Sequence, residues 1–115
     1  METTKKDFEL FKKEFTKWQV KFELSHFRIE FIHEYVEGAR AQITSSPCNS
    51  TGVVRLSTDW KEDEVDKNKI LDSSKHEAIH LLFSKFSVQA KDKDYTSSDL
   101  DDTEEEIVRK LGFII

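Results

Sequence analysis

The chain contains almost no cysteine: Cys48 is the only one among 115 residues. An intrachain disulfide is therefore impossible, and a single thiol fits a reducing compartment, so we expect a cytoplasmic protein. No histidine or basic cluster lies beside Cys48 in the sequence. We therefore interpret Cys48 as an inert thiol and not as a nucleophile.

The chain also lacks a surplus of positive charge and any long apolar run. Its formal net charge is −5, whereas a protein that neutralises phosphates needs a surplus of Lys and Arg on one face, so we expect no nucleic-acid partner. The opening residues "METTKKDFEL" lack the apolar stretch of a signal peptide, and runs such as "LLF" are far too short to cross a bilayer. We therefore expect no membrane partner.

The chain does contain enough apolar side chains for one modest core. Apolar residues make up 37% of it, and nine residues are Phe. Highly charged disordered chains are usually poor in aromatic residues, so this composition indicates a folded protein. The length fits one domain over residues 1–115.

The spacing of apolar residues predicts the fold class. Aromatic residues at steps of three and four predict a helix over about residues 4–24, and we interpret their stripe as a core face and not an interaction surface. A two-residue period predicts a strand over 26–36, followed after short connections by strands in 39–46 ("ARAQITSS") and 53–57 ("VVRLS"). Further helices are expected over about 66–85 and from 98 or 99 onward. The prediction is an α+β fold of three helices with a small, mainly antiparallel, three-stranded sheet.

The stretch "SSKHEAIHLLFSKF", residues 73–86, carries the chemistry that the sequence suggests. His76 and His80 are four residues apart, so on a helix both imidazoles can reach one tetrahedral zinc ion. Glu77, one step round the helix, can hold a water molecule beside that ion. The alternative is a pair of partly buried helix histidines that are hydrogen-bonded to neighbours.

A zinc site of this kind needs a third protein ligand, and the expected closing helix offers Glu104, Glu105 and Glu106. Carboxylates in a first helical turn are also favoured by the helix dipole, and both interpretations can hold together. At 100° per residue, the apolar face of that helix is centred within about 20° of Glu104. We therefore predict Glu104 as the third ligand ahead of Glu105.

With these segments in place, the chain resembles the small zincins of gluzincin type found in bacteria and their phages, metallopeptidases reduced to little more than a catalytic core. The resemblance rests on an ordered set: a leading amphipathic helix, a sheet ending in "VRLSTDW", the "HEAIHLL" helix, an acidic loop and "EEEIVRKL". It departs from larger relatives at Val108, where they have an Asp that supports a histidine.

The resemblance implies a zincin-like fold and a zinc-dependent metallopeptidase. One zinc ion per chain would be bound by His76, His80 and a glutamate of the closing helix, with Glu77 as the general base and a peptide or protein as substrate. It also implies that "VVRLS" lies at the sheet edge and holds an extended substrate. Tyr95, His26 and His33 are candidate oxyanion donors, each of which also fits a structural role.

Two other functions compete with the peptidase. The first is a non-catalytic module that keeps zinc or only the fold, such as a small phage protein that engages a host partner through its acidic surface. The second is calcium binding by "DKDYTSSDLDDTE", which has acidic and hydroxyl residues at EF-hand-like offsets but Asp99 where the loop needs Gly. The sequence names neither the substrate nor the oligomeric state.

Overall fold

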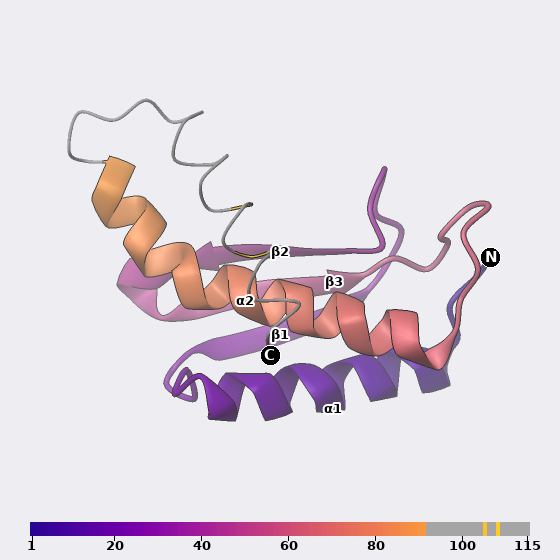
Figure 1. Cartoon of the computed structure of the whole chain (residues 1–115), viewed down its shortest axis with the longest axis horizontal. Coiled ribbons are helices and arrows are strands. Elements are labelled where there is room, and N and C mark those ends of the chain that lie inside the picture. The colour runs from indigo at the N-terminus through magenta and orange to yellow at the C-terminus, as the bar shows by residue number, and fades with distance from the viewer. Residues whose placement is uncertain (92–104, 106–107, 109–115) are drawn as a thin grey trace.

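A computed structural model of the chain describes residues 1–91, Glu105 and Val108. The elements in chain order are helix α1 (Lys5–Lys21), strands β1 (Arg28–His33) and β2 (Ala41–Ser46), the short 3-10 helix η1 (Pro47–Asn49), strand β3 (Thr51–Leu56) and helix α2 (Lys67–Lys91) (Figure 1). Glu105 and Val108 have helical backbone geometry.

Both long helices begin at side chains that satisfy free backbone N–H groups. Thr4 caps α1 by accepting a hydrogen bond from the Asp7 N–H, and the Asp7 carboxylate accepts one in return from the Thr4 N–H. At the start of α2, the Asp66 carboxylate accepts a hydrogen bond from the Lys69 N–H at 2.9 Å. Such caps fix where a helix begins.

The sheet has the strand order β1-β3-β2, with β1 parallel and β2 antiparallel to the central strand β3. Residues paired across strands share a face, so Phe31, Val54 and Ile43 project together toward the helices. Gly38, at φ +72°, lies in the turn that leads from β1 to β2, where a residue with a Cβ would be strained.

The core lies between this sheet face and the two helices, which pack against each other (Figure 1). Its buried aromatic residues come mainly from the α1 stripe, which confirms the prediction of a core face there. The buried residues of the cluster are Phe11, Phe15, Trp18, Leu24, Phe27, Val54, Leu56, Trp60, Ile70, Ala78 and Leu81.

The structure corrects the predicted fold class in its details. The described residues form two α-helices and a mixed three-stranded sheet, so the prediction of three helices with a mainly antiparallel sheet is wrong, although the α+β class is right. The predicted closing helix lies outside the described residues except for Glu105 and Val108. The strand 53–57 does not form the sheet edge, because β3 is central and β2 is the edge strand that contacts α2.

A helix that crosses a bilayer must be about 20 residues long and predominantly apolar. Within the described residues, neither helix meets both requirements.

Candidate metal centre

The two histidines of the motif lie one turn apart on α2 and face each other. Their Nε2 atoms are 3.1 Å apart, and their rings meet edge to face with centroids 4.7 Å apart. Both side chains are partly buried. Burial lowers the pKa of His76, and the neighbouring His80 lowers it further, so His76 is held in the neutral form that binds metals.

Glu105 completes a three-residue cluster with these histidines. Its Oε1 atom lies 2.9 Å from Nε2 of His80, and the ligand atoms of the three residues all lie within 4.8 Å of one another. Glu104 and Glu106 lie outside the described residues, so Glu104 as third ligand stays a prediction. The glutamate that lies beside the histidines in the structure is Glu105, which the sequence analysis ranked second.

The cluster fits a zinc ion in donor type and nearly in spacing. Two imidazole nitrogens and a carboxylate oxygen are ordinary zinc ligands, and tetrahedral ligand atoms at zinc bonding distance are about 3.3 Å apart. The distances from His80 to His76 and to Glu105, 3.1 and 2.9 Å, are close to that value. The largest separation, up to 4.8 Å, requires a small movement of a side chain, and Glu105 is exposed.

Glu77 differs from the other buried polar side chains near the motif. Its side chain is buried, with 6% of the residue exposed, and among the described residues its Oε2 atom has no hydrogen-bond partner. Burial, with a smaller contribution from the Glu105 carboxylate, raises the pKa of Glu77 to about 7. A carboxyl group with a pKa near neutrality suits proton transfer at physiological pH.

A cleft of about 330 Å³ lies against His76 and Glu77. Its opposite wall is formed by residues 39–41, which enter the edge strand β2. Asp72 and Ser73, one turn before the motif on α2, complete the lining. The histidine pair and the unpartnered carboxyl group therefore lie beside an open space next to a strand edge.

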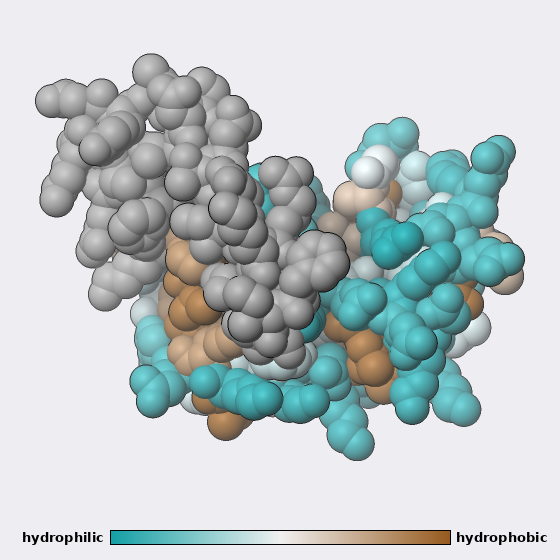
Figure 2. Space-filling model, in the orientation of Figure 1, coloured by the Kyte–Doolittle hydropathy of each residue, from teal (hydrophilic) through white to brown (hydrophobic). Residues whose placement is uncertain are grey.

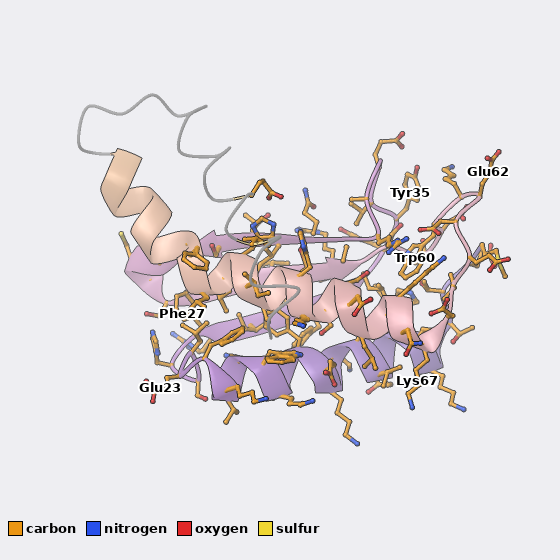
Figure 3. The ribbon with its side chains drawn as sticks, in the orientation of Figure 1. Glu23, Phe27, Tyr35, Trp60, Glu62 and Lys67 are labelled. Atoms are coloured by element: carbon orange, nitrogen blue, oxygen red, sulfur yellow. The ribbon has the colours of Figure 1, made fainter. Side chains whose placement is uncertain are left out.

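A second cleft, of about 380 Å³, shares Ala39 and Arg40 with the first. Tyr35 and Trp60 line it, and both are labelled near the loops that follow β1 and β3 (Figure 3). Hydrophilic side chains dominate this end of the molecule in the face that Figure 2 shows. Arg40 forms the boundary between the clefts, where its guanidinium lies 5.2 Å from the centre of the Trp60 ring and its Nε donates to Asp63.

Two of the three predicted oxyanion donors, His26 and His33, are not brought to the clefts. His26 is exposed and contacts the ring of Phe27, while His33 is stacked on Phe8. Neither lines either cleft. Tyr95 lies outside the described residues, as does the whole of the alternative calcium-binding stretch "DKDYTSSDLDDTE", residues 92–104.

Sequence reasoning missed the three other polar residues of the cleft: Arg40, Asp72 and Ser73. A signal was present for two of them, because Asp72 and Ser73 precede His76 and Glu77 by four residues each and so share their helix faces. Arg40 had no such signal, since only the folded sheet brings the start of β2 against α2.

Comparisons with protein-family models, with curated proteins and with solved structures found no match to this chain. The candidate site therefore rests on its residues and their geometry.

Proposed function

We propose that this protein is a zinc-dependent peptidase. One observation carries the proposal: His76, His80 and Glu105 bring three ligand atoms within 4.8 Å of one another, beside a cleft that the buried Glu77 also lines. A pair of helix histidines that binds no metal would account for the closeness of His76, His80 and Glu105. It would not account for a buried carboxyl group whose Oε2 has no partner.

In the proposed reaction, His76, His80 and Glu105 hold one zinc ion per chain. When bound there, zinc would lower the pKa of a water molecule and polarise the carbonyl of the peptide bond. Glu77 accepts a proton from the water as its oxygen attacks the carbonyl carbon. Glu77 would then transfer this proton to the leaving nitrogen as the C–N bond breaks, which leaves a carboxylic acid and an amine.

The edge strand β2 supports the choice of a peptide as substrate. Within the described part of the chain, β2 pairs with β3 alone, so the N–H and C=O groups along its other edge have no strand partner. An extended peptide can add to such an edge through main-chain hydrogen bonds. Because Ala41 both begins β2 and lines the cleft, a peptide paired there would pass beside Glu77.

We also propose that the protein acts in the cytoplasm. Cys48 is exposed and is the chain's single thiol, which fits the reducing cytoplasm.

Two measurements test the function. Elemental analysis of the purified protein should find about one zinc per chain in wild type and in the control His26→Ala, whose imidazole is outside the cluster, and much less in His76→Ala. Digestion of a broad library of blocked peptides, followed by mass spectrometry, should detect cleavage by wild type. Zinc at full occupancy in His76→Ala would overturn the metal site.

Zinc bound without any cleavage would favour the competing function, a non-catalytic zinc-binding module. Absence of zinc in the wild-type protein would leave only the bare fold as an interaction module. The same two measurements therefore separate all three functions.

A further inference from the structure

The charged groups around the 330 Å³ cleft are not equally available to a ligand. Arg40 is already engaged, because its Nε lies 2.5 Å from Oδ2 of Asp63 and its guanidinium lies over the Trp60 ring. Asp72 is exposed and, among the residues that the structure describes, forms no ion pair or hydrogen bond. The charge of Arg40 is thus balanced by Asp63, while the negative charge of Asp72 has no such counterpart among the described residues.

A second observation indicates that something binds in this cleft. Glu77 lines it with a side chain that is more than nine-tenths buried, yet Oε2 has no partner. Buried polar atoms in folded proteins are nearly always hydrogen-bonded, to protein or to a bound molecule. The lining of the cleft thus includes a buried acceptor and, on the same helix, an exposed carboxylate, neither of which has a partner among the described residues.

We propose that Asp72 selects substrates with a cationic nitrogen group near the bond to be cleaved: a lysine or arginine side chain, or a free amino terminus. This inference rests on the proposed peptidase and names its substrate class. Asp72 precedes His76 by one helical turn, about 6 Å along the axis, and an extended peptide advances about 3.3 Å per residue. The cation therefore belongs within about two residues of the cleaved bond.

An acidic substrate is disfavoured for the same geometric reason. It would approach the Asp72 carboxylate with like charge, and the Nε–H of Arg40 is already donated to Asp63. A cation meets the Asp72 carboxylate without breaking any contact. Because Asp72 is exposed, the pair is screened by water, and its contribution to discrimination is about two- to fivefold.

The test measures peptide binding in a background that cannot turn the peptides over. Glu77→Gln is titrated with acetylated, amidated hexapeptides of alanine and phenylalanine in which each position in turn is lysine, Nε-acetyl-lysine or glutamate. A lysine-free peptide with a free amino terminus is included, so that the two sources of the cation can be told apart. The same titrations are made after adding Asp72→Asn, Asp72→Lys or the control Glu30→Gln.

Glu30 is a suitable control because it is an exposed acidic residue on β1, the opposite edge of the sheet from β2. With Asp72 present, we expect the lysine or free-amino peptide to bind about two- to fivefold more tightly than its neutral counterpart. Glu30→Gln should keep that preference, Asp72→Asn should abolish it, and Asp72→Lys should shift it toward glutamate. The preference should also shrink as the salt concentration rises.

Equal dissociation constants for charged and neutral peptides, no measurable binding of the cationic ones, or a preference that survives Asp72→Asn would each overturn the proposal. Its fate is separable from that of the peptidase. If the protein prefers cationic peptides through Asp72 but cleaves no peptide, the role of Asp72 in binding is supported and the proposed peptidase activity is rejected. Cleavage without any preference for cations would do the reverse.

Discussion

Ser74 and Glu77 lie within one turn of α2 and are both buried, yet their polar atoms are in opposite situations. The Ser74 hydroxyl donates a 2.9 Å hydrogen bond to the Phe11 carbonyl of α1. The Oε2 atom of Glu77 has no partner. A buried polar group without a partner costs free energy of folding. The Glu77 carboxyl group therefore weakens the fold, whereas the Ser74 hydroxyl strengthens it.

Other buried polar side chains resemble Ser74. The Gln19 amide donates to the carbonyls of Leu24 and Phe27, at 2.9 Å each, and so fixes the turn after α1. The Ser57 hydroxyl donates to the Asp59 carbonyl at 2.9 Å. These polar groups thus hold elements together, whereas the Oε2 atom of Glu77, a residue of the cleft lining, does not do so among the described residues.

The largest effect should follow from changing Glu77. Glu77→Gln keeps the size of the side chain but cannot accept a proton from water, so peptide hydrolysis should fall by about 10²- to 10⁴-fold, the range for general base catalysis. The zinc content should not change. Because the variant replaces a buried carboxyl group that lacks a partner, its metal-free form should unfold at a temperature no lower than that of wild type.

Rates on a cleaved library peptide and thermal unfolding of the metal-free proteins check both expectations. A clear loss of stability in Glu77→Gln would mean that the carboxyl group holds the fold, as Ser74 does, and would remove the contrast between the two positions. Unchanged hydrolysis would remove Glu77 from the reaction.

Ser74→Ala should have the opposite profile. It removes a buried hydrogen bond between the helices, but the Phe11 carbonyl keeps its helical donor, so the loss should be about 0.5–1.5 kcal/mol in the free energy of unfolding, while zinc affinity stays the same. Thr16→Ala is the matched control, because the Thr16 hydroxyl also donates to a helix carbonyl, that of Lys12, but is exposed. It should change stability by less than about 0.5 kcal/mol. Urea unfolding of the three proteins measures the difference, and equal losses would show that burial is not the cause.

The metal cluster can be tested through its glutamate. Glu105→Gln should weaken zinc binding at least about tenfold, because even groups that merely orient a metal ligand contribute that much. Glu104→Gln and Glu106→Gln serve as controls of identical chemistry. Competition with a zinc-binding dye measures all three, and a larger loss in Glu104→Gln would restore the ligand that the helical spacing predicted.

Local patterns in the sequence were sufficient for the elements. The three-and-four spacing of aromatic residues predicted α1, and the two-residue period predicted β1, because each reports which face of a single element is buried. The order of strands is not local information. Nothing in "VVRLS" states that β3 lies between the other two strands, so its predicted place at the sheet edge was wrong.

In the candidate site, too, local spacing predicted some features, while others depended on how separate elements pack. The four-residue spacing of His76 and His80 brought their Nε2 atoms to 3.1 Å, as expected for one helix face. The choice of a glutamate depends on how two segments pack, which a helical wheel of one segment does not contain. Arg40 was missed for the same reason, since it reaches the cleft from another element.

The smallest effect concerns His33, a histidine that serves the fold and not the cleft. Its ring is stacked on Phe8, and its Nε2 lies 2.6 Å from the Thr3 hydroxyl, which itself donates to the Ser57 carbonyl. The His33 Nε2 is therefore the donor in this pair. Burial lowers the pKa of His33 below its ordinary 6.5, against an opposing effect of the Asp7 carboxylate on α1.

Because the folded-state pKa of His33 is the lower one, the unfolded chain takes up a proton first as the pH falls. The contribution of neutral His33 to stability is thus complete above pH 6.5 and is lost as the pH falls below that value toward the folded-state pKa. His33→Gln cannot titrate, so its unfolding temperature should fall less steeply than that of wild type between about pH 7 and 5. Metal-free samples are compared, and the other three histidines are the same in both proteins. Parallel curves would mean that the neutral ring is not favoured by the fold.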